Sequence, residues 1–554
     1  MSVLPPARND LSEKERASAI VTRQAQPPPD AWSPTRQNYI AIWSLSIISM
    51  VVGLDTTILI PALPTIAEDL NATAIQAFWC ATSYVLSCTV CQLFIASLSH
   101  IFGRCELLLI SELLFAAGTA IVCSAHGIAQ LLVGRSIQGI GGGGIVALVQ
   151  VVFTDIIPLR HRPKYLGYLQ VASALGTISG PLVGGAVSQY STWRWIFYIN
   201  FPFCLGGLIT LPLGLKFQQF ETSFVSRLLL IDWFGGFLFT ASATSFLMAL
   251  SWGGVQFPWG SFHTLVPLIV GLVGVGVALV WEAYGTKEPF LKLSVFNSWS
   301  AAAAQICSFA QGFLLLGQLY YIPFYFEGVK GMSPILTGVA LIPRTFTNIP
   351  IATITGIMIT KLGRFRWAVW SGWILSTIGS GLLILFDVHT PTAAWVIILL
   401  VNGLGQGLLL ASLNVAVLAI AAGKNPGFAV ATYTFTRFLG MSFGIAVGGT
   451  IFQNALSQCL AHQGIDTAIA QNAEAYIIEL SSEAVSADYK AKVVYAYAQA
   501  FRCVFIALAA VSAIATALGF CIASFPLGKK TPSVPVSVPA PPPEGGPEKT
   551  QAEV

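Results

Sequence analysis

The hydrophobic and polar positions of this chain alternate in long blocks. Fourteen mostly apolar stretches lie between residues 40 and 525, and short polar segments separate them. The hydrocarbon core of a bilayer is about 30 Å thick, and a helix of about 20 residues crosses it. Lipid offers no hydrogen-bond partners, so only helices or closed barrels satisfy their own backbone groups there. The pattern therefore predicts an all-α polytopic membrane protein with 14 transmembrane helices.

Composition supports this interpretation. The chain is 55% hydrophobic and only 9% charged, and its mean hydropathy is +0.73, whereas soluble domains carry about 25% charged residues. A soluble enzyme is therefore excluded. The expected spans are residues 40–62, 76–98, 105–125, 128–153, 165–188, 194–215, 229–251, 263–283, 301–325, 335–360, 367–386, 393–420, 427–451 and 502–525.

Lysine and arginine are distributed unevenly between the two sets of loops. Twenty of them fall in the terminal tails and in every second loop, and five fall in the alternate loops. Cytoplasmic loops carry the excess of basic residues in membrane proteins. The asymmetry predicts an even number of spans with both termini in the cytoplasm.

Two nine-residue segments reveal an internal repeat. Residues 96–104 follow the second span and end in Gly103-Arg104, and residues 356–364 follow the tenth and end in Gly363-Arg364. If spans 7 and 8 are an insertion, the tenth span corresponds to the second. We therefore expect two six-helix bundles plus two inserted linker helices, an architecture that transporters use with a binding site between the halves.

This division predicts the following domains. Residues 1–38 form a disordered cytoplasmic tail, 39–216 the N-terminal bundle, 217–292 the two linker helices, 293–526 the C-terminal bundle with an outer loop at 452–500, and 527–554 a disordered cytoplasmic tail. The sequon at Asn71 lies in a short acidic outer loop and is a candidate glycosylation site, although short loops are often left unmodified.

Charged residues inside spans are the strongest functional signal, because each costs at least about 2.5–3.5 kcal/mol at a helix centre. They are Asp55 in span 1, Glu112 in span 3, Arg135 in span 4, Arg344 in span 10 and Arg437 in span 13. A buried carboxylate can exchange a proton near neutral pH, and a nearby arginine can compete with that proton. A structural ion pair is the alternative for each residue.

Glycine-rich motifs occupy spans 4 and 5. Gly139, Gly141 and Gly144 match a dinucleotide-binding pattern, but no strand precedes them, so close helix packing is the better interpretation. Span 5 holds Gly176, Gly180, Pro181, Gly184 and Gly185. Proline frees a backbone carbonyl inside a helix, so a kink or hinge is expected there.

These motifs resemble the signatures of the major facilitator superfamily. The resemblance spans about residues 38–525, and the Gly180-Pro181 element resembles one specific to antiporters. The segment from Trp193 to Asn200 and the number of spans resemble the fourteen-spanner drug:proton antiporters in their fungal form. This resemblance implies proton coupling through Asp55 with Arg135 as partner, a hinge at Gly180-Pro181, and a cytoplasmic gate at Gly103-Arg104 and Gly363-Arg364.

The cytoplasmic loop departs from the pattern of that family. The family usually has an acidic residue where this chain has His100, and basic residues where it has Ile101 and Cys105. The latch formed by this loop is therefore expected to be weaker or to rely on Arg104, and His100 could make it sensitive to pH.

Neutral polar and aromatic residues in the spans are candidates for a substrate cavity between the halves. The candidates are Tyr84, Gln138, Gln150, Gln305, Gln311, Tyr320, Tyr321, Phe324, Asn402, Gln406, Asn414 and Arg437. Such a mixture suits amphipathic, weakly charged molecules. Packing against lipid is the common alternative for each aromatic residue.

We therefore expect a monomeric, proton-coupled exporter of small amphipathic organic molecules at the plasma membrane, with a vacuolar or vesicle membrane as the alternative location. The absence of a Walker A motif excludes ATP as its energy source, and we expect no metal, cofactor, nucleic-acid partner or enzymatic activity. The ten cysteines are scattered, and Cys88 and Cys91 lie inside a span with no nearby histidine. A proton-coupled importer on the same scaffold and a non-transporting sensor are the alternatives.

Overall fold

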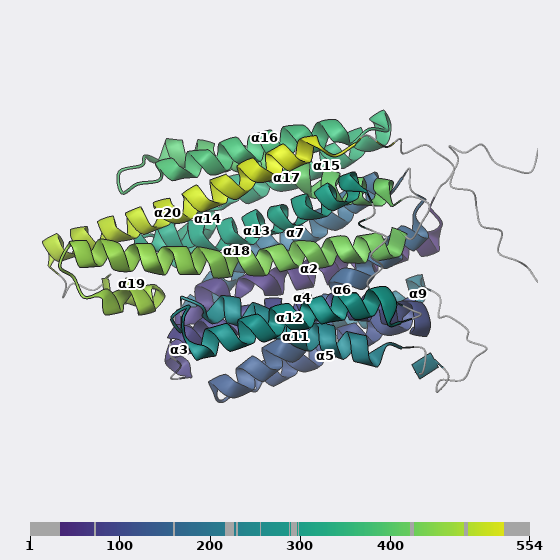
Figure 1. The fold of residues 1–554 in the computed structure, drawn as a ribbon, viewed down its shortest axis with the longest axis horizontal. Helices are drawn as coiled ribbons and strands as arrows, with labels where there is room; N and C mark the ends of the chain where they lie inside the picture. The colour runs from purple at the N-terminus through teal and green to yellow at the C-terminus, as the bar shows by residue number, and fades with distance from the viewer. Residues whose placement is uncertain are drawn as a thin grey trace, which may run out of the picture.

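The chain folds into a bundle of long helices that run along its longest axis (Figure 1). The computed structural model describes residues 34–70, 72, 74–158, 161–215, 227–228, 231–254, 256–286, 289, 296, 298–421, 426–480, 486–523 and 525. Within these residues, fourteen helical segments are long and apolar enough to cross a membrane. The predicted fold class and the predicted number of spans are confirmed.

The long helices follow the expected order along the chain. They are α2 (Arg36–Ile58), α4 (Ala74–Phe102), α5 (Arg104–Cys123), α6 (Ile128–Ile156), α7 (Arg162–Tyr190), α9 (Asn200–Gly214), α11 (Trp233–Trp252), α12 (Phe262–Tyr284), α13 (Trp299–Gly328), α15 (Ile342–Leu362), α16 (Arg366–Leu382), α17 (Thr392–Ile420), α18 (Pro426–His462) and α20 (Ala487–Phe520). The short helices are η1 (Ile60–Ala62), α3 (Leu63–Asp69), α8 (Trp195–Tyr198), α14 (Pro334–Ala340), η3 (Leu383–Leu385), η4 (Thr467–Asn472) and α19 (Ala473–Leu480).

The first span has the expected length of 23 residues but lies four residues earlier in the chain than predicted. Helix α2 ends at Ile58 rather than at residue 62, and η1 and α3 continue the chain. Pro61 and Pro64 explain the break, because proline lacks the N–H that continues a helix and clashes with the preceding turn.

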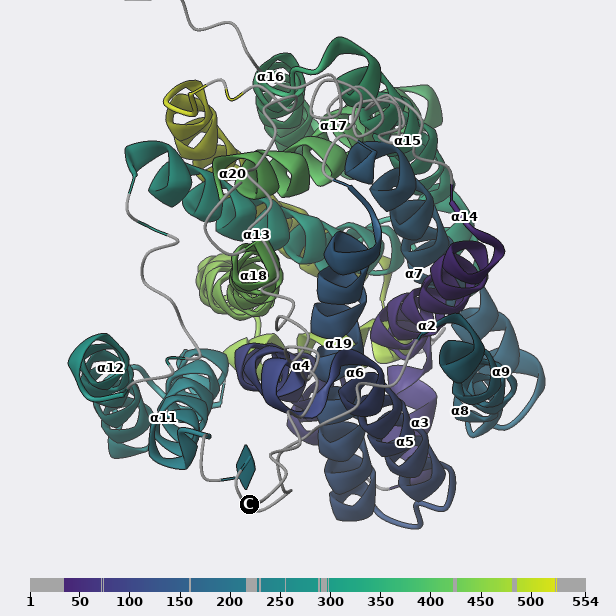
Figure 2. The same cartoon turned by 90° about the vertical axis from the view of Figure 1, so that its right-hand side faces the viewer.

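Two six-helix bundles pack in the same way. In the first, α2 contacts α7 and α9, and α6 contacts α4 and α5. In the second, α13 contacts α18 and α20, and α17 contacts α15 and α16. When α13 is matched to α2, α15 to α4 and the later helices in chain order, each of these contacts in the first bundle has its counterpart in the second. This agrees with the repeat seen in the sequence. The bundles meet where α7 contacts α15 and where α4 contacts α18, as Figure 2 shows end on.

The linker helices α11 and α12 pair with each other at one side of this interface (Figure 2). Helix α11 contacts α4 of the first bundle and α18 of the second. Phe239 and Phe246 of α11 pack against Phe435 and Phe443 of α18, with ring centroids 5.7 and 5.8 Å apart. The insertion therefore covers one of the two places where the bundles meet.

The segment predicted as an outer loop, residues 452–500, contains alanine-rich runs that predict helix, and much of it is helical. Helix α18 extends to His462 and α20 begins at Ala487, with η4 and α19 between them. Buried residues on α20 recur with helical spacing at Val493, Ala496, Tyr497, Ala500 and Phe501. These side chains form one apolar face, which gives the extended helices their packing. Asn71, residues 1–33 and residues 526–554 lie outside the described residues.

Candidate functional site

An ion pair lies fully inside the first bundle. Nη1 of Arg135 on α6 donates to Oδ2 of Asp55 on α2 across 2.5 Å, and the two side chains are 1% and 0% exposed. Oδ1 of Asp55 accepts hydrogen bonds of 2.9 Å from Nε2 of Gln138 and Nδ2 of Asn200. The carboxylate thus receives charge-assisted hydrogen bonds from two helices besides its own.

The arginine of this pair is also held in place. Its Nε donates to the carbonyl oxygen of Cys80 at 3.1 Å, and its guanidinium carbon lies 4.4 Å from the ring centroid of Tyr84. Removing one partner of a buried, hydrogen-bonded pair leaves an uncompensated charge. Asp55 and Arg135 therefore stabilise each other in the state that the structure shows. Asn200 completes the set, and sequence reasoning did not single it out.

Glu112 lies apart from this network. The residue is 1% exposed on α5, and neither carboxylate oxygen has a hydrogen-bond partner among the described residues. Gly207 of α9 makes room for it, because a Cβ at that position would overlap with the Glu112 carboxylate. An unpaired buried carboxylate is costly, so Glu112 stays a second candidate for carrying a proton.

The glycines of α7 form a close seam with α2. A Cβ added at Gly176 would overlap with the carbonyl oxygen of Met50, and one added at Gly184 would overlap with that of Ile58. Gly180 makes room for the hydroxyl of Thr57 in the same way. Gly185 lies on the same helix. Only residues without side chains allow the two backbones to approach so closely.

Pro181 leaves one carbonyl of α7 without a partner in its own helix. Proline has no N–H, so the carbonyl of Thr177, four residues earlier, lacks its helical hydrogen bond. Oγ1 of Thr57 on α2 donates to that oxygen at 2.9 Å. Thr57, two residues after Asp55, therefore joins α2 to α7 at the turn that Pro181 interrupts.

The loop between α4 and α5 is tied to its surroundings through Arg104. Nε of Arg104 donates to Oδ2 of Asp155 on α6 at 3.0 Å, and Nη1 donates to the hydroxyl of Ser99. Gly103 adopts a φ of 98°, which favours glycine. His100 stacks on Phe428 of α18 with ring centroids 4.5 Å apart. This loop thus touches the opposite bundle through an aromatic contact.

The corresponding loop of the second bundle is less connected. Gly363 ends α15 with a φ of 65°, and the carbonyl oxygen of Arg364 accepts a hydrogen bond from Trp367 at 3.0 Å. Among the described residues, the Arg364 side chain makes no ion pair. The repeat therefore keeps a glycine with positive φ in both loops but not the charge contacts.

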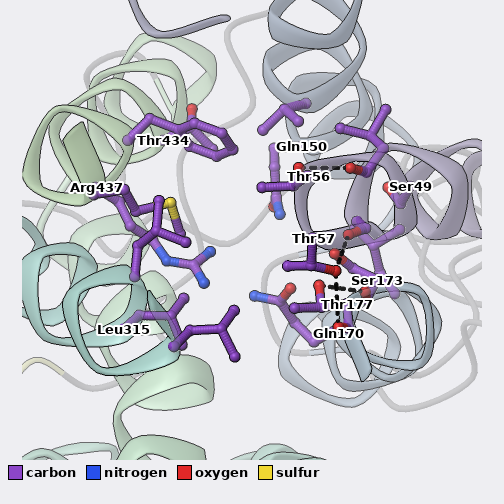
Figure 3. Close-up of a pocket in the computed structure, with 18 residues that line it drawn as sticks. Ser49, Thr56, Thr57, Gln150, Gln170, Ser173, Thr177, Leu315, Thr434 and Arg437 are labelled. Atoms are coloured by element: carbon purple, nitrogen blue, oxygen red, sulfur yellow. Dashed lines mark hydrogen bonds between the residues drawn. The ribbon is translucent and has the colours of Figure 1, made fainter. Parts of the chain in front are cut away.

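A cavity lies between the two bundles (Figure 3). It comprises about 750 Å³ of empty space, part of it open to solvent, and a neighbouring space of about 530 Å³ shares Gln170, Ser173, Thr177 and Arg437 with it. We refer to the two together as the central cavity. Its wall on the first bundle carries mainly neutral polar side chains, and its wall on the second combines apolar side chains with Arg344 and Arg437. The polar lining residues are Ser49, Thr56, Thr57, Gln150, Gln170, Ser173, Thr177, Arg344, Thr345, Asn348, Thr434 and Arg437.

Comparisons with known proteins agree with this arrangement. The sequence pattern of the Major Facilitator Superfamily matches residues 45–445. The chain belongs to the Major Facilitator Superfamily. The MFS transporter L2 of Phoma sp. is 42% identical over 473 residues, which cover 81% of this chain and 79% of the relative. The MFS-type efflux pump LUC4 of Fusarium sp. is 34% identical over 462 residues, covering 82% and 80%.

A solved superfamily structure has the same fold. It is a bacterial homologue of the human lysosomal transporter Spinster in an inward-facing, occupied conformation. The TM-score is 0.56 at 16% identity, and the match covers 88% of this chain and 97% of the other. At this identity the likeness concerns the fold alone.

For this member of the superfamily, only part of the predicted cavity set lines the cavity. Arg437 and Gln150 line it, and Asn414 donates to Gln150 at 3.3 Å from the other bundle. Gln138 instead belongs to the Asp55 network. Gln170, Ser173 and Thr177 were not predicted, although their spacing of three and four residues places them on one face of α7.

The remaining candidates lie behind the cavity wall in the second bundle. Gln311 accepts from Nε of Arg437 at 2.8 Å and donates to Gln406 at 3.4 Å. Asn402 accepts from Nε of Arg344 at 2.9 Å. The other four are buried without lining either part of the cavity, and they are Gln305, Tyr320, Tyr321 and Phe324. Tyr84 packs on Arg135.

Proposed function

We propose that this protein is a proton-coupled efflux transporter, which exports small amphipathic organic molecules by alternating access. Its membership of the superfamily and its similarity to proteins named as efflux pumps support export. We further propose that it acts as a monomer at the plasma membrane with both termini in the cytoplasm. The bias of basic residues toward one set of loops supports this orientation.

One observation carries the proton coupling. Asp55 faces the interior of the first bundle, while Thr56 and Thr57, the next two residues of α2, line the central cavity. A single turn of helix therefore bears the ionisable group on one side and a wall of the cargo site on the other. A change in the hydrogen bonds of Asp55 is transmitted to the cavity through the backbone of α2.

Protonation of Asp55 changes what holds α2 to its neighbours. The ionised carboxylate binds Arg135, Gln138 and Asn200. A neutral carboxyl group is a weaker acceptor and has no ion pair with Arg135. Protonation thus loosens α2 from α6 and α9, and the glycine seam with α7 gives α2 a smooth surface along which to move. Cargo and proton then favour different arrangements of the same helix.

Reconstituted vesicles test this proposal. Proteoliposomes that contain the pH indicator pyranine report proton movement when amphipathic organic acids, amides and amines are added, with protein-free vesicles subtracted. We expect proton flux with the native chain, none with Asp55→Asn, and native flux with Asp488→Asn. Asp488 is an exposed carboxylate on α20 and serves as the matched control. Equal flux from Asp55→Asn and the native chain would rule out Asp55 as the coupling group.

The direction of transport is tested in cells. An exporter lowers the intracellular level of a compound that elicits proton flux in vesicles, whereas an importer raises it. Deletion of the gene should therefore increase retention of that compound. Decreased retention would favour the importer.

A further inference from the structure

The central cavity carries positive charge that no acidic residue balances. Arg344 of α15 and Arg437 of α18 both line it. Neither guanidinium forms an ion pair among the described residues. Arginine stays protonated in proteins, so both side chains are cations at every pH at which the protein works.

The hydrogen-bond partners of both arginines are neutral. Arg344 is 3% exposed; it donates to Asn402 at 2.9 Å, to Gln318 at 3.0 Å, and more weakly to the carbonyl oxygen of Leu315 at 3.5 Å. Arg437 donates through Nε to Gln311 at 2.8 Å. These amides orient the guanidinium groups, and they do not neutralise them. The Nη atoms of Arg437 have no hydrogen-bond partner among the described residues.

Acidic residues on the surrounding helices are paired with other arginines or lie outside the cavity lining. The helices that line the cavity are α2, α6, α7, α13, α15, α17 and α18, and they contain three acidic residues. Asp55 is paired with Arg135, and Asp155 is paired with Arg104 near the end of α6. Glu327 lies at the last turn of α13 and does not line the cavity.

The wall opposite Arg437 offers a further donor. Gln170 of α7 is 7% exposed, and its buried Nε2 has no hydrogen-bond partner among the described residues. Figure 3 shows the guanidinium of Arg437 and the amide of Gln170 pointing toward each other from opposite walls. An acceptor placed between them would receive hydrogen bonds from both bundles at once.

From these features we infer that the cargo is an organic anion, whose carboxylate or equivalent acidic group binds Arg437 between the two bundles. A guanidinium binds a carboxylate through two parallel hydrogen bonds, and Arg437, a half-buried cation without a countercharge, gains from pairing with an anion. Arg344 adds a second positive charge to the same cavity. The apolar body of the cargo packs on Leu315, Leu319 and Phe438, which line the second bundle's wall. This inference rests on the proposed function, because it treats the central cavity as the cargo site.

Binding to the purified protein tests the inference without any gradient. The full chain in lipid nanodiscs is titrated with 1-naphthylacetate, 1-naphthylacetamide and 1-naphthylethylammonium, which share an apolar body and differ in charge. We expect the acid to bind roughly tenfold more tightly than the amide, the size of one charge-assisted hydrogen-bond pair, and the cation to bind most weakly. Equal affinities, a preference for the cation, or no binding by the acid would overturn the inference.

Substitutions locate the site. Arg437→Gln should remove the preference for the acid, and Arg437→Lys should keep part of it. Gln170→Glu is nearly isosteric and places a carboxylate opposite Arg437, so it should weaken binding of the acid and leave the amide unaffected. Arg502→Gln removes an exposed cation of α20 and should change nothing. Unchanged preference in both Arg437→Gln and Gln170→Glu, with native melting curves, would place the site elsewhere.

The binding experiment and the proton-flux experiment test the two proposals separately. Selective binding of the acid without proton-driven movement would refute the proposed coupling and keep the anion site. Proton-driven movement of amides or amines without selective binding of the acid would refute the anion site and keep the proposed coupling.

Discussion

At the scale of single residues, the carbonyl oxygen of Thr177 depends on a hydroxyl from another helix. Pro181 removes its partner within α7, and Thr57 of α2 replaces it at 2.9 Å. A buried backbone carbonyl without a partner is unfavourable. The proline therefore does more than loosen α7, because it creates an acceptor that only the correctly placed α2 can satisfy.

Thr57→Val should reveal this dependence. The substitution keeps the shape of the side chain and removes the donor, so it should lower the free energy of unfolding by roughly 1–3 kcal/mol, the cost of an unsatisfied buried polar group. We also expect slower transport, because the same contact fixes the position of α2 along α7. Thermal melting in nanodiscs and proton flux in vesicles measure the two effects.

Thr57→Ser is the matched control, since it retains the hydroxyl. It should melt close to the native chain and transport at a similar rate. If valine and serine behave alike, the hydroxyl has no role in the seam.

At the scale of elements, a polar clasp joins α3 to the start of α8. Nε1 of Trp193 donates to Oδ2 of Asp69 at 2.9 Å, and Nη1 of Arg194 donates to the same oxygen at 3.2 Å. Arg194 also donates to the carbonyl oxygen of Ala125 at 2.8 Å. The Trp-Arg pair that resembled a family signature therefore fastens three segments together at one end of the first bundle.

The clasp should respond to acid. Hydrogen bonds from Trp193, and then from Arg194, lower the pKa of the Asp69 carboxyl group below its ordinary value of 3.8. A carboxyl group with a lowered pKa in the folded state stabilises the protein above the unfolded pKa, and this stabilisation is lost as the pH falls through the folded value. Asp69→Asn should therefore melt at a lower temperature than the native chain at pH 7.

This difference in melting temperature should shrink as the pH falls below the ordinary carboxyl value of 3.8 toward the lower folded value, at which Asp69 of the native chain becomes protonated. Glu68→Gln, at the exposed neighbouring position, should melt like the native chain at both values. A difference between Asp69→Asn and the native chain that does not depend on pH would contradict the assignment.

The elements were more predictable from the sequence than their contacts. Apolar blocks of membrane-spanning length identify the helices directly, and the cost of a buried charge marked Asp55 and Arg135 as special. Asn200 is 145 residues from Asp55 and is a common neutral residue, so no local pattern joins the two. Alanine-rich runs predict helix within residues 452–500, but the apolar blocks end near 451 and begin near 502, so they do not show that α18 and α20 continue beyond those positions.

At the scale of the whole molecule, the two bundles share a fold and differ in charge. The first contains an internally neutralised pair, Asp55 with Arg135. The second presents Arg344 and Arg437 to the cavity without a countercharge. The proposed proton site and the proposed anion site thus lie in different halves, and we propose that the relative movement of the halves couples them.

This division of charge predicts a dependence on membrane potential. If one proton enters through Asp55 for each anion that leaves, two charges move per cycle, and a potential of 100 mV contributes roughly 4.6 kcal/mol. In proteoliposomes without a pH gradient, a potassium diffusion potential that is negative on the cargo side should drive 1-naphthylacetate out of that side. The reversed potential should suppress this movement.

1-Naphthylacetamide provides the control, because its exchange for one proton moves half the charge. Its transport should show a correspondingly smaller dependence on potential. If transport of the acid does not depend on the potential, exchange of one anion for one proton is excluded.

The placement of α11 also bears on how cargo reaches the site. This helix lies against α4 and α18 and so covers, on the lipid side, one of the two places where the bundles meet. At the other, where α7 meets α15, the short helix α14 contacts α7, and no inserted helix pair lies there among the described helices (Figure 2). An acid dissolved in the bilayer would therefore meet a thicker wall of helices on one flank of the protein than on the other, so the insertion makes the two lateral routes unequal.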